Sequence, residues 1–108
     1  MIHRLAVGEN GAVSRRLPKR PTHPGTVLLE EFLKPMGISQ LAFAKHIGVS
    51  FKRINEIING RRAITPETAW LFAKAFGNSP QFWMNLQATY DLVHHKVERR
   101  VTKIAVAV

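Results

Sequence analysis

The chain has 108 residues, 45% of them apolar and none of them cysteine, so we expect one domain whose small core relies on neither disulfide bonds nor a cysteine-built metal site. Sixteen Lys and Arg residues against seven Asp and Glu residues give a formal net charge of +9, which favours nucleic acid as a partner over an anionic membrane surface or a purely solubilising role. No apolar stretch is long enough for a membrane span or a secretory leader, so the sequence predicts a soluble, cytoplasmic protein.

Residues 1–22 come first and hold two isolated glycines, two prolines and the basic cluster SRRLPKRP. This composition cannot form a continuous apolar face, and we therefore interpret the segment as a flexible basic arm. The sequence leaves open whether the basic side chains of the arm contact DNA or are merely solvated. These side chains are Arg15, Arg16, Lys19 and Arg20.

The first helix is predicted in the stretch GTVLLEEFLKPMG. Its apolar residues recur at steps that place them on one helical face, and its charged residues lie elsewhere. Pro35 and Gly37 are expected to end the helix. The predicted inner face consists of Leu28, Leu29, Phe32, Leu33 and Met36.

Two short helices follow, QLAFAKHI and FKRINEII, each preceded by a serine that can cap its first turn. Gly48 separates them with a tight turn, and Asn59-Gly60 ends the second. Asn-Gly is also a hairpin signal, but the flanking residues keep a helical period, so we interpret it as a helix end. The expected core positions of the first of these helices are Phe43, Ala44 and Ile47.

Two further helices each begin at a cap followed by a proline, Thr65-Pro66 and Ser79-Pro80. We take residues 23–92 as the folded domain and residues 93–108 as a C-terminal extension. Its last stretch, VTKIAVAV, is compatible with a strand, a helix end or a tail. The expected inner faces are Ala69, Phe72, Ala73 and Phe76 in the fourth helix, and Trp83, Leu86, Tyr90, Val93 and Val97 in the fifth.

The helix FKRINEII carries two different faces. At about 100° per residue, its three isoleucines fall on one side, while Lys52, Glu56 and the following Asn59 fall on the opposite side, flanked by Arg53 and Asn55. The isoleucines are expected to hold the helix against the core. The outer face is polar and basic, as in a helix that enters the DNA major groove while the preceding helix crosses the phosphate backbone.

The stretch SQLAFAKHIGVSFKRINEIINGRR resembles the helix-turn-helix of the Xre family of lambda-repressor-like proteins. HPGTVLLEEFLKPMGISQ, NGRRAIT and especially FWMNLQATYDL resemble HigA antitoxins of toxin–antitoxin modules. The resemblance covers residues 23–92. It implies an all-α, five-helix DNA-binding domain that needs no cofactor and binds an operator palindrome as a homodimer. It also implies autorepression and neutralisation of a toxin ribonuclease.

The resemblance also implies roles for individual residues. Lys52 is suited to donate to guanine O6 or N7, and Glu56 to accept from cytosine N4. Phe51 replaces a usually polar residue, and its ring either touches a thymine methyl or folds onto the core. The expected base readers are Phe51, Lys52, Asn55 and Glu56, and the expected phosphate contacts are Gln40, Ser50, Arg53, Asn59, Arg61 and Arg62.

Two apolar residues, Trp70 and Leu71, fall off the inner face of the fourth helix. Spare apolar surface usually marks a partner site, and a homodimer contact is favoured here over a toxin contact. Leu41 and Ala42 are apolar where polar residues are common, and they are expected to add to such a surface. Trp83 and Tyr90 are instead assigned to the core.

An enzyme is not expected. Ser39, Ser50 and Ser79 are interpreted as helix caps rather than nucleophiles, because no Ser–His–acid arrangement surrounds them. A metal site is not expected either, because Asp91, His94 and His95 share a helical spacing but lack further ligands.

We therefore predict a DNA-binding repressor that acts as a HigA-type antitoxin. One alternative is a solitary Xre-type regulator that has no toxin. The alternative from another class is an interaction protein whose basic face binds RNA or an acidic protein.

Overall fold

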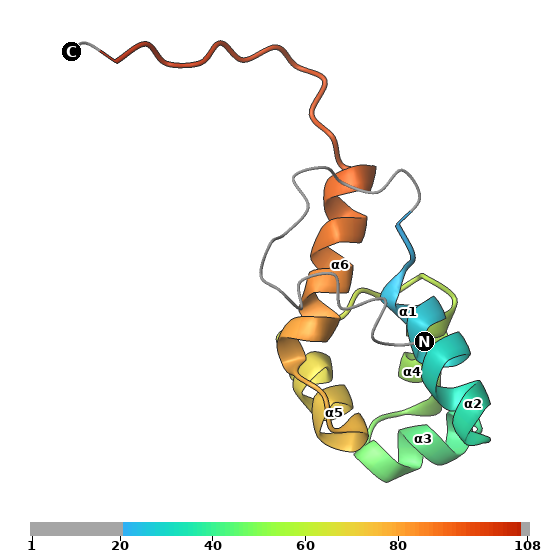
Figure 1. Ribbon diagram of the computed structural model, residues 1–108. Helices are drawn as coiled ribbons and strands as arrows, with labels where there is room; N and C mark the ends of the chain where they lie inside the picture. The colour runs from blue at the N-terminus through green and yellow to red at the C-terminus, as the bar shows by residue number, and fades with distance from the viewer. Residues whose placement is uncertain (1–20, 107–108) are drawn as a thin grey trace.

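The computed structural model describes residues 21–106, and all regular structure in that range is helical (Figure 1). The basic arm predicted for residues 1–22 therefore lies almost wholly outside the described residues. No helix in the described range is long and apolar enough to cross a bilayer. The elements are α1 (Pro24–Val27), η3 (Leu28–Leu33), α2 (Lys34–Met36), α3 (Gln40–Ile47), α4 (Phe51–Ile58), α5 (Pro66–Phe76) and α6 (Pro80–His94).

The first three elements follow one another without a break and form one helix, so the fold has the predicted five-helix, all-α architecture. The middle part, η3, is π-helical, and the backbone N–H of Lys34 donates to the carbonyl of Leu29, five residues earlier. A proline ring inside a regular α-helix clashes with the carbonyl four residues before it, and the wider π turn relieves that contact. Pro35 therefore lies inside the helix instead of ending it, and Gly37 is the residue at which it ends.

The same irregular turn changes which residues face the core. Leu28, Phe32 and Leu33 are buried as predicted, and Leu29 is partly buried against them. The prediction for Met36 is wrong, because its side chain is 55% exposed. A regular 100° step assumes an unbroken α-helical geometry, which the π turn interrupts.

The predicted helix starts are confirmed. Ser39, Ser50 and Ser79 each accept a hydrogen bond from the backbone N–H three residues later, at 3.0–3.1 Å. Thr65 and Thr68 form a reciprocal capping box at the start of α5. Between α3 and α4, Gly48 has φ of +80°, a left-handed conformation that side chains disfavour.

The core lies where the first helix (through α1 and η3), α3, α4, α5 and α6 meet. Trp83 is fully buried at its centre, with its ring centroid 5.1 Å from those of Phe32, Phe72 and Phe82. The indole N–H donates to the side-chain oxygen of Asn78, so burial leaves no polar atom of the ring unpaired. The other fully or nearly fully buried apolar residues include the predicted Phe43, Ala44, Ile54, Ile57, Ile58, Ala69 and Ala73.

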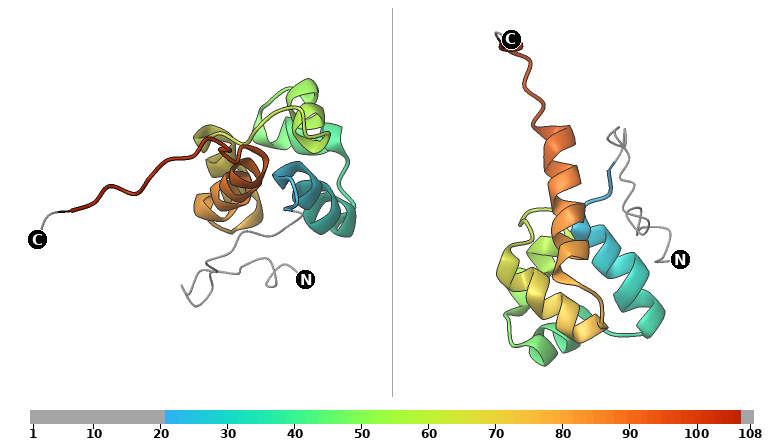
Figure 2. Two further views of the ribbon diagram at one scale, coloured as in Figure 1. Left: turned by 90° about the horizontal axis from the view of Figure 1, so that it is seen from above. Right: turned by 60° about the vertical axis from the view of Figure 1, so that its left-hand side comes forward.

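The end of α6 departs from the predicted pattern. This helix packs against α5 and α1 and then continues past them (Figures 1 and 2). It ends at His94, and Val97, predicted to lie on its inner face, lies beyond the helix and is 69% exposed. Residues 101–106 have no regular structure and lead away from the helices, which favours the tail among the three alternatives for VTKIAVAV.

The helix α1 approaches α4 very closely at Gly25. A Cβ atom built at this position would lie 1.8 Å from the carbonyl oxygen of Ile57. Only glycine permits this approach, because any side chain would overlap the backbone of α4. The backbones of α1 and α4 are therefore in direct contact at Gly25.

His23 caps the first helix and is partly buried. Its Nδ1 accepts the backbone N–H of Gly25 at 2.9 Å, and its ring meets the ring of Tyr90 edge-on at 4.8 Å. Partial burial lowers the pKa of His23 below its ordinary value of 6.5, and the nearby Asp91 carboxylate offsets part of that effect. The neutral ring is the form that the fold accepts, because a protonated Nδ1 cannot cap the helix.

We therefore expect the protein to lose stability as the pH falls below 6.5 and passes through the lower pKa of folded His23, because the unfolded chain then binds the proton more readily. Urea unfolding midpoints at pH about 7.5 and about 5.5 test this. His23→Asn is the matched control, since asparagine caps helices without titrating in this range. An equal fall in midpoint for wild type and His23→Asn would contradict a role for His23.

Candidate nucleic-acid interface

The helices α3 and α4 form a helix-turn-helix. The two helices are in contact, and the small residue Ala44 of α3 is buried. The carbonyl of Ala44 accepts the N–H groups of both Gly48 and Val49, which closes the end of α3 and directs the chain into α4. These two backbone hydrogen bonds thus hold the turn between the two helices.

The two faces of α4 differ as predicted. Ile54, Ile57 and Ile58 are buried, while Lys52 on the opposite face is exposed. Phe51 is 46% exposed, so its ring does not fold onto the core. Of the two predicted roles, the contact with a thymine methyl group therefore stays a prediction. Lys52 and Arg61 make no ion pair within residues 21–106, which leaves both available to an anionic partner.

Three amide side chains connect the two helices. Asn55 in α4 donates through Nδ2 to Oε1 of Gln40, the first residue of α3, at 3.0 Å. Asn59 donates to Oδ1 of Asn55 at 3.1 Å. Gln40 takes part in this network through its oxygen alone, so its N–H donors suit a phosphate oxygen. The network holds the side chain of Gln40, a predicted phosphate contact, in a defined position beside that of Asn55, a predicted base reader.

Arg53 is less available than predicted for a phosphate contact. Its Nη2 lies 2.8 Å from Oε1 of Glu67 in the first turn of α5, and its side chain is only 27% exposed. Its Nε is buried and has no partner in the described part of the chain. This ion pair between Arg53 and Glu67 connects α4 to α5. The sequence did not predict it, because the two residues are 14 positions apart in the chain.

Glu56 and Arg62 form an ion pair between a predicted base reader and a predicted phosphate contact. Both Nε and Nη2 of Arg62 approach Oε1 of Glu56, at 2.9 Å and 2.8 Å. The hydrogen bond from Arg62 lowers the pKa of Glu56, and the charges of Arg62, Lys52 and Arg61 act in the same direction, against the opposing effect of desolvation. The two side chains are thus held together on one surface.

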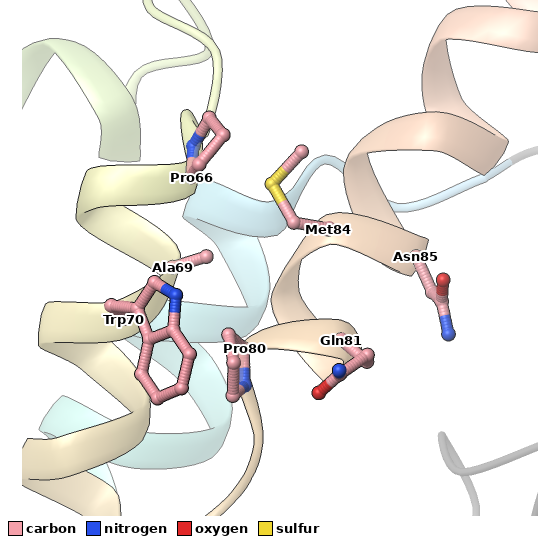
Figure 3. Close-up of a pocket in the computed structure, with 7 residues that line it drawn as sticks. All are labelled: Pro66, Ala69, Trp70, Pro80, Gln81, Met84 and Asn85. Carbon is pink, nitrogen blue, oxygen red and sulfur yellow. The ribbon is translucent and has the colours of Figure 1, made fainter.

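Trp70 stands beside a cavity of about 240 Å³ between α5 and α6 (Figure 3). The indole is 57% exposed, and Figure 3 shows it on α5, opposite Pro80 and Gln81 at the start of α6. Leu71, predicted to share this surface, is instead only partly exposed and packs against the core. Leu41 is exposed on a different helix, α3. The cavity is lined by Pro66, Ala69, Trp70, Pro80, Gln81, Met84 and Asn85.

The structure also shows polar residues whose roles the sequence did not reveal. Gln87 is buried and accepts the backbone N–H of Ile64 at 2.7 Å, while its amide donates to Asp91. Gln87 thereby supplies a hydrogen-bond partner for a backbone N–H group in the loop between α4 and α5. Near the end of α6, the rings of His94 and His95 bond to carbonyls of their own helix, and no cluster of three or more potential metal ligands occurs in residues 21–106.

Residues 29–83 match the helix-turn-helix family HTH_3. Among curated proteins, the chain is 51% identical over 70 residues to virulence-associated protein I of Dichelobacter nodosus, and this match covers 65% of each chain. It is 41% identical over 78 residues to antitoxin HigA-1 of Vibrio cholerae, covering 72% of this chain and 73% of that protein. The chain thus spans about two thirds to three quarters of these relatives.

Solved structures are also similar to this chain. A HigA-family addiction module antidote protein from Coxiella burnetii shares 41% identity with a TM-score of 0.71, covering 79% of this chain and 99% of that one. Pseudomonas aeruginosa antitoxin HigA, solved with the higBA promoter, is 36% identical in sequence to this chain, and the TM-score is 0.66. The match covers 76% of this chain and 100% of that one.

Proposed function

This chain belongs to the helix-turn-helix family HTH_3, and we propose that it is a DNA-binding repressor that reads an operator with α4. The observation that supports the proposal is the polar surface of α4. Lys52 is exposed opposite three buried isoleucines, and beside it the amide side chains of Asn55 and Asn59 are joined by a hydrogen bond. Such a helix fits the major groove, whose base edges present donors and acceptors. The family match agrees with the expectation that the chain is not an enzyme.

The site residues of this proposal divide into two groups. Base readers are proposed at the start and on the outer face of α4, and phosphate contacts are proposed around them. Gln40 gains from its place at the N-terminus of α3, where backbone N–H groups attract anions. Arg53 contributes mainly by holding α5 to α4 through Glu67.

Two substitutions separate these roles. Lys52→Ala should reduce the preference for operator over random duplex by roughly 10- to 100-fold, because removing a base contact affects one sequence more than others. Arg61→Ala should weaken both duplexes alike and reduce the salt slope of binding by about 0.9 for each phosphate that the side chain no longer neutralises. The measurement is affinity for a duplex selected by the wild-type protein and for a random duplex at several salt concentrations.

Equal losses of affinity on both duplexes for folded Lys52→Ala would show that α4 is rotated differently in the groove, and Asn55 would become the leading candidate. Binding to RNA or to an acidic protein, with no preference for any duplex, would support the alternative of a basic interaction protein.

We further propose that the protein is the antitoxin of a toxin–antitoxin module, neutralises a toxin ribonuclease encoded beside it, and acts in the cytoplasm, where its operator is. The support is its similarity to HigA antitoxins over most of their length. Co-purification with the product of the neighbouring gene, and rescue of cells that express that product, test this role. Rescue should survive Lys52→Ala if DNA and toxin use separate surfaces. A solitary regulator would have no such neighbour and would rescue nothing.

We propose that the operator is a palindrome bound by a homodimer, which joins two half-sites about one helical turn apart. Trp70 supports a two-fold contact, because it is an exposed knob beside a cavity on the same face of one chain (Figure 3). In a two-fold contact each partner supplies both the knob and the hole. The cavity of about 240 Å³ exceeds the roughly 150 Å³ that holds benzene in an engineered protein cavity.

The position of this surface also suits DNA binding. Glu67 lies one turn before Trp70 on α5 and is bound to Arg53 of α4. A contact between two copies at α5 would therefore fix the two α4 helices relative to each other. The rival for this surface is the toxin, in which case a homodimer would have to form through a different surface.

A further inference from the structure

We propose that Arg62 reads a guanine in the major groove and that Glu56 acts as its positioning residue instead of reading a base itself. The inference rests on the proposed binding of DNA by α4. It changes the roles expected from the sequence, in which Glu56 is a base reader and Arg62 a phosphate contact. The observation behind the inference is the geometry of the ion pair between the Glu56 carboxylate and the Arg62 guanidinium.

The contact uses one edge of the guanidinium and leaves another free. Nε and Nη2 of Arg62 both approach Oε1 of Glu56, at 2.9 Å and 2.8 Å. A guanidinium has five N–H donors in a fixed plane, so the Nη1 hydrogens and the second Nη2 hydrogen are not used by Glu56. One Nη1 hydrogen and the free Nη2 hydrogen are parallel, and together they are the two donors that a bidentate contact to guanine O6 and N7 requires.

The ion pair brings the guanidinium of Arg62 to the outer face of α4. Glu56 lies on the outer face of α4, together with Lys52, whereas Arg62 follows the helix in the loop toward α5. A loop arginine without a partner would extend into solvent or toward a phosphate. The bond to Glu56 draws the Arg62 side chain back over α4, and it still keeps 47% of its surface exposed.

The charge of the pair also argues against a phosphate role for Arg62. Its positive charge is compensated by the carboxylate of Glu56, so the pair adds little to the long-range attraction of DNA phosphates. Arg61, next to it in the chain, is exposed and makes no ion pair within the described residues. These neighbouring arginines therefore serve as a matched pair for experiment, one expected to read sequence and the other to bind the backbone.

The test is a double-mutant cycle on DNA. The probe is the duplex that the wild-type protein selects from a random library, together with variants in which each base pair is replaced in turn. Arg62→Ala should remove discrimination at one G·C pair per half-site, by roughly 10- to 100-fold, with little change in salt slope. Glu56→Ala should weaken discrimination at that same G·C pair.

Two further variants distinguish positioning from direct readout. Glu56→Gln should restore part of the discrimination, because an amide oxygen still accepts a bond from Arg62. The double variant Glu56→Ala with Arg62→Ala should be no worse at that base pair than Arg62→Ala alone, since a positioning residue has no effect once its partner is removed. Arg61→Ala is the control and should weaken all duplexes alike.

Three results would overturn the inference. One is that Glu56→Ala affects a different base pair from Arg62→Ala, or that their effects multiply, either of which makes Glu56 a reader in its own right. Another is that Arg62→Ala weakens all duplexes alike, with a decrease in salt slope equal to that of Arg61→Ala. The third is a wild-type protein that selects no duplex, which would overturn the proposed function as well, whereas the first two leave DNA binding intact.

Discussion

Gly25→Ala is expected to destabilise the domain by at least about 3 kcal/mol, and so to remove a large share of the roughly 5–15 kcal/mol typical of a small domain. The added Cβ would lie 1.8 Å from the carbonyl oxygen of Ile57 and 2.8 Å from the Cα of Ile58, and both are backbone atoms that no rotamer change can move aside. The helix α4 would have to shift away from α1. Urea unfolding of the purified variant, followed by circular dichroism, measures the destabilisation.

The same substitution should impair DNA binding beyond its effect on stability. Ile57 and Ile58 belong to the buried face of α4, so a shift that relieves the clash also moves the proposed reading helix relative to α3. The matched control is Gly37→Ala, where a Cβ would meet nothing within 4 Å and only the φ of +67° opposes the side chain. That variant should be destabilised by about 1 kcal/mol. Equal destabilisation of the two variants would show that α1 and α4 are not in close contact in solution.

Trp70→Ala is expected to produce the second large effect, the loss of the homodimer. Truncating a tryptophan at the centre of an interface typically costs about 2–4 kcal/mol or more, and a two-fold contact contains two copies of it. Dimerisation should therefore weaken by at least about 100-fold. Affinity for a palindromic duplex should fall with it, while the affinity of each half-site stays unchanged. Analytical ultracentrifugation and binding to duplexes with one or two half-sites measure both quantities.

Met36→Ala is the matched control for this prediction. The Met36 side chain is similarly exposed, at 55% against 57% for Trp70, and it lies at the end of the first helix. Its removal should leave the oligomeric state unchanged. A Trp70→Ala protein that remains dimeric, but no longer co-purifies with the neighbouring gene product, would assign the surface to the toxin instead.

Much of the fold follows from local sequence patterns. Ser39, Ser50, Thr65 and Ser79 start helices because their side chains satisfy N–H groups that the first turn leaves free, and this requires only nearby residues. The three isoleucines of α4 share a buried face because their spacing matches the helical period. The helix-turn-helix and the outward face of its second helix could therefore be predicted from the amino-acid sequence.

The local pattern is insufficient where the backbone makes an irregular turn or where distant parts of the chain come into contact. A regular helical step predicts Met36 and Val97 on inner faces, but a π turn precedes Met36 and α6 ends before Val97. Leu71 is predicted on a partner surface, yet it packs against the core. In each case the sequence carries the helical period, whereas burial depends on how each helix is placed against its neighbours.

The five helices, their caps, the isoleucine face of α4 and the basic, polar character of the surface opposite it all follow from local sequence patterns. The pairing of the polar side chains on that surface does not, because it depends on the tertiary structure. Glu56 with Arg62, Arg53 with Glu67 and Asn55 with Gln40 join residues 6, 14 and 15 positions apart. A hydrogen bond requires a donor and an acceptor within about 3 Å, and no helical period brings residues at these separations to that distance. Turns and helix packing do so, and they thereby decide which charges on this surface remain free for DNA.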